Sequence, residues 1–218
     1  MRAIRPVLLA MAFAVSALSA PGAGPGLSLG AGAGLWRPLI EALAARGAIE
    51  ARFTERRYFS FRREPTVLKG VIRVSDDRGV SLGYTDPEVT TVIVDSAGLI
   101  VRDRKGRDRE MAAGSKEAGA VVSLLPILRF DADTLDSLFD TQVSMEGSGW
   151  KLEFTPRDPR AARTLGSITV WGTLTEVARI EFRRSASQRI EIEVGETRTG
   201  VVFSAAELSR YFRRPAPR

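Results

Sequence analysis

The chain has 218 residues, of which 44% are hydrophobic and 27% are charged, a composition typical of globular proteins. It contains neither cysteine nor histidine, which excludes disulfides, thiol nucleophiles, Ser-His-Asp triads and zinc sites built on those residues. The formal net charge is +6, but 26 acidic residues interrupt the basic ones. We therefore expect an ordinary solvated basic surface, with a basic patch facing an anionic membrane as the alternative.

The first segment, residues 1–20, is typical of a secretory signal peptide. Arg2 and Arg5 precede an apolar run over residues 7–18, and small residues follow at the expected cleavage region. The run is shorter than the roughly 20 apolar residues that a membrane span needs, although a retained helical anchor is the alternative. Export argues against nucleic acid as a partner.

A spacer and a helix come next. Residues 21–34 (PGAGPGLSLGAGAG) lack any hydrophobic period and predict a Gly/Ala/Pro-rich flexible linker. We therefore expect one folded domain over residues 35–218. Its first element is predicted to be an amphipathic helix, because apolar residues recur at helical spacing before a glycine stop: Leu35, Leu39, Ile40, Leu43 and Gly47.

After this helix the hydrophobic period changes to two, which predicts half-buried β-strands. Turn signals at residues 76–79, 85–87 and 95–98 separate the strands, and connections this short predict antiparallel neighbours. The expected strands carry their apolar positions at Ile49, Ala51, Phe53, Phe59 and Phe61, at Leu68, Gly70, Ile72 and Val74, at Val80, Leu82 and Tyr84, at residues 89–94 and at residues 99–101.

Two charged residues interrupt the apolar face of the first strand. By strand parity, Glu55 and Arg57 share the face of Phe53 and Phe59. We interpret them as marking the point where the strand leaves the sheet and turns to solvent. The alternative is an ion pair at the rim of a cavity.

The alternation stops at residues 115–130, where the apolar residues form a mostly helical stretch with a surface too broad for one buried stripe. Pro126 is expected to kink this helix or to end it early. Asp131 or Asp133 then caps a second short helix. The surrounding sequence superficially resembles a calcium loop, but it lacks the glycine and the closing glutamate that such a loop needs, so we expect no metal site.

Strands with cleaner alternation resume around residues 150–154, 168–170, 180–182 and 190–194. Each has one apolar and one polar face, as in an antiparallel sheet with one face solvated. A long sheet of this kind buries its apolar face by curling and by packing against helices. The predicted fold is therefore mainly β (α+β), a strongly curved antiparallel sheet forming a half-open barrel, with an N-terminal helix and a helical lid.

Several short motifs, taken in order, resemble the LolA-like periplasmic outer-membrane lipoprotein carriers. Residues 51–55 (ARFTE) are similar to the family's Phe-Thr-Gln strand, and a glycine-initiated strand follows at residues 70–74. The segments 84–87 (YTDP) and 92–95 (VIVD) resemble family turns. The apolar insert stands where the family has its lid, and residues 150–156 (WKLEFTP) resemble the family's Leu-Thr-Pro strand end.

The resemblance implies a hydrophobic cavity for acyl chains beneath a lid that opens. Its wall would consist of Phe53, Phe59, Ile72, Leu82, Tyr84, Trp150, Leu152, Phe154, Ile180, Phe182, Ile190 and Ile192. Its lid would consist of Val121, Leu124, Leu125 and Leu128. In typical members an arginine holds the lid closed, and Arg73 and Arg78 are the candidates here.

The function implied by the resemblance is a monomeric periplasmic carrier without catalytic residues, metal or cofactor. Its cargo would be lipoproteins or other acylated lipids, received from an inner-membrane release complex and delivered to an outer-membrane acceptor. Two alternatives remain open. One is a lipid-sensing module that signals to a partner, and the other is a carboxylate-based enzyme acting on a lipid or glycan.

Overall fold

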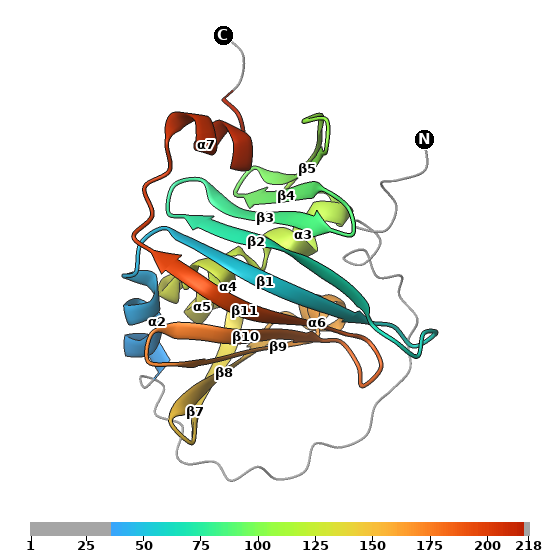
Figure 1. The fold of residues 1–218 in the computed structure, drawn as a ribbon. Helices are drawn as coiled ribbons and strands as arrows, with labels where there is room; N and C mark the ends of the chain where they lie inside the picture. Colours follow the sequence, from blue (N-terminus) through green and yellow to red (C-terminus); the bar gives the residue numbers. More distant parts are fainter. Residues whose placement is uncertain (1–35, 216–218) are drawn as a thin grey trace.

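The computed structural model describes residues 36–215 (Figure 1). Eleven strands form one open antiparallel sheet in the order β6-β5-β4-β3-β2-β1-β11-β10-β9-β8-β7, so that the first and last strands of the chain lie side by side at its centre. The predicted signal peptide (1–20) and linker (21–34) lie outside the described residues. The strands are β1 (Ile49–Tyr58), β2 (Thr66–Ser75), β3 (Gly79–Asp86), β4 (Thr90–Asp95), β5 (Gly98–Asp103), β6 (Asp108–Ala112), β7 (Phe139–Glu146), β8 (Gly149–Pro156), β9 (Ser167–Thr173), β10 (Glu176–Arg183) and β11 (Arg189–Thr199).

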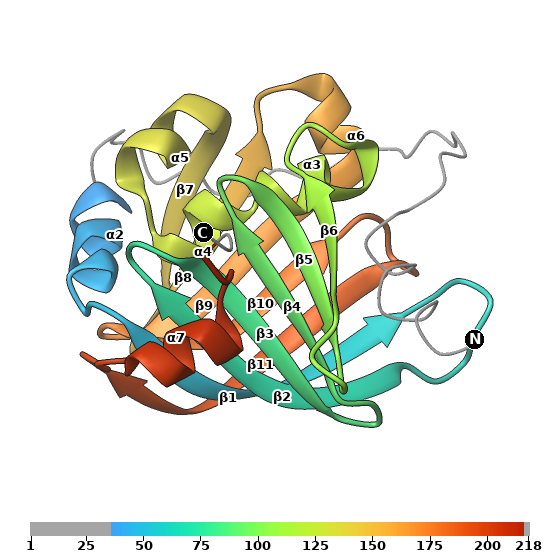
Figure 2. The same ribbon diagram turned by 90° about the horizontal axis from the view of Figure 1, so that it is seen from above.

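The sheet curls strongly, and most helices lie on its concave side (Figure 2). This arrangement confirms the predicted half-open barrel with an N-terminal helix and helices across its mouth. Within residues 36–215, no helix is long and apolar enough to cross a bilayer. The helices are α2 (Trp36–Ala44), α3 (Lys116–Val122), α4 (Leu125–Arg129), α5 (Ala132–Leu138), α6 (Pro159–Leu165) and α7 (Ala205–Tyr211).

The apolar stretch in the middle of the chain folds as two short helices rather than one. α3 ends at Val122, and α4 begins at Leu125 with Pro126 in its first turn. Backbone N–H groups in the first turn have no partner within the helix, so a proline there costs no hydrogen bond. Proline therefore starts the second helix. The break lets the two helices bury different faces, which accounts for an apolar surface too broad for one straight helix. Asp131 caps α5 by accepting a bond from the Thr134 backbone.

Four elements were not predicted from the sequence: β6, β7, α6 and α7. β6 (DREMA) is a mostly exposed edge strand whose polar residues hide its period. α6 begins with an Asp158 cap and Pro159 in its first turn, and α7 begins with a capping box between Ser204 and Glu207. Both helix starts carry ordinary sequence signals for a helix N-terminus.

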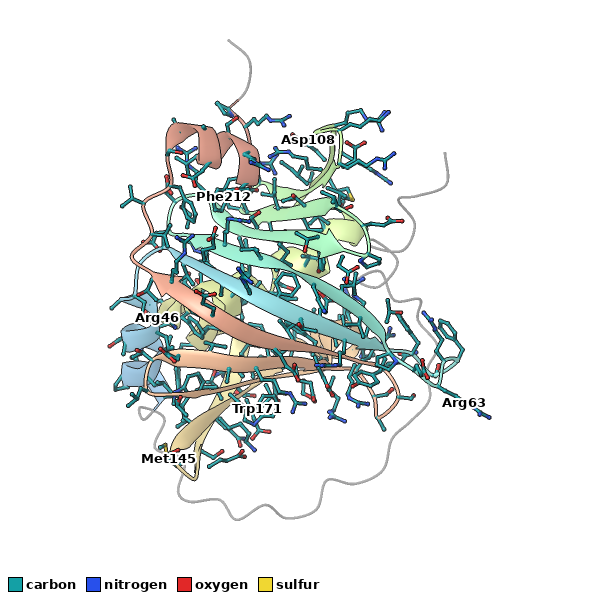
Figure 3. The ribbon with its side chains drawn as sticks, in the orientation of Figure 1. Arg46, Arg63, Asp108, Met145, Trp171 and Phe212 are labelled. Atoms are coloured by element: carbon teal, nitrogen blue, oxygen red, sulfur yellow. The ribbon has the colours of Figure 1, made fainter. Side chains whose placement is uncertain are left out.

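The C-terminal helix α7 covers the convex side of the sheet, opposite the other helices (Figures 1 and 2). Phe212 is fully buried, as are Ile93 and Ile100 on the outward faces of β4 and β5. Figure 3 shows Phe212 between α7 and the sheet. Arg73, which also faces outward, stacks over the Tyr211 ring at 3.7 Å. This part of the sheet is therefore buried on both faces.

Arg102 fastens the end of α7 to the sheet. Its guanidinium donates to the backbone carbonyls of Ser209 (3.1 Å), Arg210 and Phe212 (3.2 Å). It also forms an ion pair with Asp108 at 2.7 Å. Because the last carbonyls of a helix lack partners within the helix, a cation placed there stabilises the helix end.

Candidate functional site

The concave face of the sheet carries a continuous apolar lining that crosses from one half of the sheet to the other. Most of the predicted wall residues are buried in one hydrophobic cluster there, with Phe182 partly buried at its border. Those buried in the cluster are Phe53, Ile72, Leu82, Tyr84, Trp150, Leu152, Phe154, Ile180, Ile190 and Ile192. Strand parity thus placed these side chains on the correct face.

Phe59 is placed elsewhere. β1 ends at Tyr58, so Phe59 lies in the turn to β2, half-buried and stacked on Phe61 with ring centroids 5.3 Å apart. The prediction that Phe59 lies on the wall is therefore wrong. Strand parity assigns faces only while the backbone remains extended, and the strand ends one residue earlier. Ser60 is the one turn-favouring residue here, and on its own between two phenylalanines it is a weak signal for a strand end.

The predicted lid residues lie on α3, on α4 and at the junction between them. Val121, Leu124 and Leu125 are buried in the same cluster as the wall, and Leu128 is half-buried against it. α3 packs against β4, β5 and β6, and α4 packs against β3 and α5. The two short helices therefore cover the half of the concave face that β3–β6 form.

The candidates for a lid-holding arginine lie away from the concave face or at its edge. Arg73 faces outward and donates to Glu50 at 2.7 Å, so it lies on the opposite side of the sheet from the lid. Arg78 lies in the β2–β3 turn and pairs with Asp77. A bond between that turn and α4 does exist, but its arginine is on the helix: Arg129 of α4 donates to the backbone carbonyl of Asp76.

A buried polar cluster interrupts the apolar wall. Glu55 and Arg57 are only 2% and 3% exposed, and Arg57 Nε donates to Glu55 Oε1. The Tyr84 hydroxyl donates to Glu55 Oε2 at 2.7 Å and accepts from Arg57 Nη2 at 3.2 Å. We call these three residues the polar cluster. A carboxylate, a guanidinium and a phenol thus satisfy one another on the concave face.

The polar cluster corrects our interpretation of Glu55 and Arg57 as residues that turn to solvent. The strand does not leave the sheet there, because Glu55 pairs with Leu68 of β2 and with Ile192 of β11. The ion pair of the alternative does form, but it is buried within the wall, which is not the predicted position at the rim of a cavity. Sequence reasoning missed Tyr84 as the third member, because it reaches Glu55 from β3, two strands away.

Burial and charge together set the protonation of the cluster. Burial raises the pKa of the Tyr84 hydroxyl well above its ordinary value, and the charge of Glu55 raises it further. Burial lowers the pKa of Arg57, but the charges and bonds of Glu55 and Tyr84 outweigh it, so the pKa is raised. At neutral pH, Arg57 is therefore cationic and Tyr84 is neutral and able to donate to Glu55.

Tyr84 is expected to make the free energy of unfolding fall as the pH rises into the alkaline range. Because its pKa is higher in the folded than in the unfolded state, its contribution is complete below about pH 10 and is lost as pH rises further. The Tyr84→Phe variant loses both hydrogen bonds of the hydroxyl, which should lower the free energy of unfolding by about 1–3 kcal/mol near neutral pH. Above about pH 10, this difference from the parent is expected to shrink by about 1.4 kcal/mol per pH unit.

Urea unfolding of the parent and of Tyr84→Phe at several alkaline pH values measures that change. The matched control is Tyr58→Phe, whose hydroxyl donates to Glu191 at 3.2 Å on the outer face. If the difference in free energy of unfolding between the parent and Tyr84→Phe stays constant across the alkaline range, the pKa of the Tyr84 hydroxyl is not raised by folding.

The chain is similar to one protein family and to several solved structures. A model of the family described as outer membrane lipoprotein carrier protein LolA-like matches residues 34–207, whereas no curated protein matches the sequence. Similar solved structures include a LolA superfamily protein from Nitrosomonas europaea, with 8% identity and a TM-score of 0.47 over 82% of this chain and 97% of that one. A putative outer membrane lipoprotein-sorting protein domain from Vibrio parahaemolyticus has 10% identity and a TM-score of 0.41 over 78% and 94%. The MucA/MucB complex from Pseudomonas aeruginosa gives 17% identity and a TM-score of 0.42 over 79% and 59%.

The family match spans the whole of the described sheet, from the residues before α2 into α7. It includes both halves of the concave wall, the polar cluster and the helices α3 and α4 that cover one half. The chain therefore belongs to the LolA-like family of outer membrane lipoprotein carrier proteins.

Proposed function

We propose that this protein is a periplasmic carrier that binds the acyl chains of lipoproteins, or of another lipid, and shuttles them from the inner to the outer membrane. The observation that supports this most is the concave wall. Its apolar lining runs across the concave side of an open sheet, and short, separate helices cover that side. Carrying a lipid without breaking a covalent bond requires no nucleophile, and an apolar wall is the surface that its hydrocarbon chains need.

The physical need for such a wall is large. Each methylene moved from water into an apolar site gains about 0.8 kcal/mol. Two or three acyl chains therefore oppose free passage through water by tens of kcal/mol on the same scale. A carrier must offer a dry apolar surface of comparable area, and the concave side of a curved sheet is such a surface when its covering helices move aside.

The polar cluster makes the wall amphiphilic. Most of the lining is aliphatic or aromatic, but Glu55, Arg57 and Tyr84 form a polar region near the end of β1. A lipid likewise joins hydrocarbon to ester, amide or phosphate groups. We propose that the acyl chains lie along the apolar part and that the polar linkage faces this cluster.

The connection between α4 and α5 supports a movable lid. Phe130 caps α4 with a φ of 54°, in the left-handed region that bulky residues rarely adopt. Its side chain is buried in the main cluster. A residue held in this conformation costs of order 1–3 kcal/mol, which the surrounding packing must offset. Loosening that packing would favour rearrangement at this joint, as opening of α3 and α4 requires.

The test begins with native purification of the exported protein without detergent, followed by mass spectrometry of co-purifying molecules. Delipidated protein is then titrated with a fluorescent fatty acid, and lipoprotein transfer is followed from donor membranes to acceptor membranes. We expect saturable binding without turnover of the probe, and transfer that depends on the protein. Absence of any bound amphiphile together with no probe binding would overturn the proposal. A stable complex without transfer would replace shuttling with sensing.

A further inference from the structure

Several of the large apolar side chains that lie exposed on the described surface sit in or next to connections between strands. Phe61 in the β1–β2 turn is 80% exposed, Leu174 in the β9–β10 turn 85% and Met145 near the β7–β8 turn 72%. Single exposed apolar residues are common and need no explanation. Their charged neighbours distinguish these tips from one another.

The β1–β2 turn combines aromatic and basic residues. Phe61 stacks on Phe59, and Arg62 and Arg63 follow directly and are exposed. These two arginines outnumber Glu64, the acidic residue of the turn. By contrast, Leu174 and Met145 are followed within two residues by Glu176 and Glu146. Residues 59–63 are called the aromatic–basic tip below.

The tip is held in shape while its apolar end stays in solvent. The Arg62 backbone N–H donates to the Phe59 carbonyl at 3.1 Å, and Arg62 Nη1 donates to Thr66 Oγ1 at 2.7 Å. The hairpin projects beyond the rest of the sheet in Figure 1, and Arg63 points outward from its end in Figure 3. The acidic β3–β4 connection lies at the same end of the sheet, but the hairpin extends past it (Figure 1).

We propose that the aromatic–basic tip docks the protein on an anionic lipid bilayer. Aromatic rings partition into the interfacial region of membranes. Each arginine close to an anionic membrane surface raises the affinity of a protein for that membrane about fivefold. Phe61 would enter the headgroup region while Arg62 and Arg63 contact lipid phosphates. A protein acceptor, which would select a particular complementary surface rather than lipid charge, is the outcome that the test separates from this one.

The position of the tip links docking to the concave site. The tip continues directly from the strand end that carries Arg57, and Arg57 pairs in register with Thr66 at the base of the hairpin. Docking would therefore hold the polar end of the wall next to the bilayer from which a lipid leaves or which it enters. This link between docking and lipid transfer rests on the proposed carrier function, whereas the membrane binding of the tip does not.

The experiment measures co-sedimentation of the cargo-free protein with vesicles of phosphatidylglycerol and phosphatidylethanolamine, and with vesicles of phosphatidylcholine alone. We expect binding to the anionic vesicles that weakens with salt. Phe61→Ser should lower it about tenfold, on the scale of burying one aromatic side chain, and Arg63→Gln about fivefold. Fatty-acid probe binding from solution should stay unchanged in both variants.

Matched controls lie at the opposite end of the strands or on the outer face. Leu174→Ser removes an equally exposed apolar side chain, and Arg52→Gln changes net charge by the same amount as Arg63→Gln at a side chain that is 80% exposed. Both should bind vesicles like the parent. The proposal is overturned if the parent protein does not bind anionic vesicles, or if the Phe61→Ser variant binds them as well as the parent does. A defect of Phe61→Ser seen only with an isolated acceptor protein would also overturn it, since the tip would then contact protein.

Discussion

Replacing Arg57 with leucine is expected to lower the free energy of unfolding by about 3–5 kcal/mol. The substitution removes the cation that faces Glu55 and leaves that carboxylate 2% exposed with Tyr84 as its remaining partner in the polar cluster. For a chain of this size, each kcal/mol shifts the melting temperature by about 2–4 °C, so we expect a fall of roughly 6–20 °C. Thermal and urea unfolding followed by circular dichroism measure both quantities.

The control removes the whole polar cluster at once. In Glu55→Leu/Arg57→Leu/Tyr84→Phe, no charge or hydroxyl is left buried without a partner, and replacing a buried ion pair by packed apolar residues is often neutral or stabilising. We therefore expect the triple variant to be at least as stable as the parent. An Arg57→Leu variant within about 1 kcal/mol of the parent would mean that Glu55 is solvated, against the buried geometry.

The triple variant also separates stability from binding. If the polar cluster faces the polar linkage of a bound lipid, the triple variant should fold and yet bind a fatty acid or lipoprotein more weakly than the parent. Unchanged affinity would restrict the cluster to a structural role, while leaving the apolar wall as the binding surface.

Alternation was enough to predict the faces of most strands. Ile180 and Phe182 turn inward and Glu181 outward, as their spacing requires, because a half-buried strand repeats every two residues. The same rule placed Glu55 and Arg57 on the concave face. What local sequence cannot supply is the partner from another strand, since Tyr84 is brought to Glu55 only by the pairing of β1, β2 and β3.

The convex core shows the same limit in another form. Ile93 and Ile100 alternate with residues that are also buried, so β4 and β5 are apolar on both sides and their outer partner must come from elsewhere. That partner, α7, follows about a hundred residues later in the chain, at positions 205–211. The capping box at Ser204 could have predicted the helix, but neither the box nor the strands indicate that the two pack together.

The lid assignment predicts that two aspartate substitutions will have different consequences. Phe154→Asp should unfold the protein, because Phe154 is fully buried on the wall and packs edge-to-face on Phe139 at 6.1 Å. Removal of a buried phenylalanine ring alone takes about 3–5 kcal/mol, and burying an unpaired charge adds to this. The sum approaches the whole stability of a typical domain, about 5–15 kcal/mol.

Leu128→Asp should instead leave the sheet folded and weaken uptake of a fluorescent fatty acid about tenfold, on the scale of one lost leucine contact. Leu128 is half-buried on α4, so a carboxylate there can reach water while it faces an incoming acyl chain. Leu138→Asp on α5, at a leucine that is 43% exposed, is the matched control and should keep full affinity. If Leu128→Asp loses stability as Phe154→Asp does, or binds as tightly as Leu138→Asp, then α4 is part of the fixed core and acyl chains do not enter beneath it.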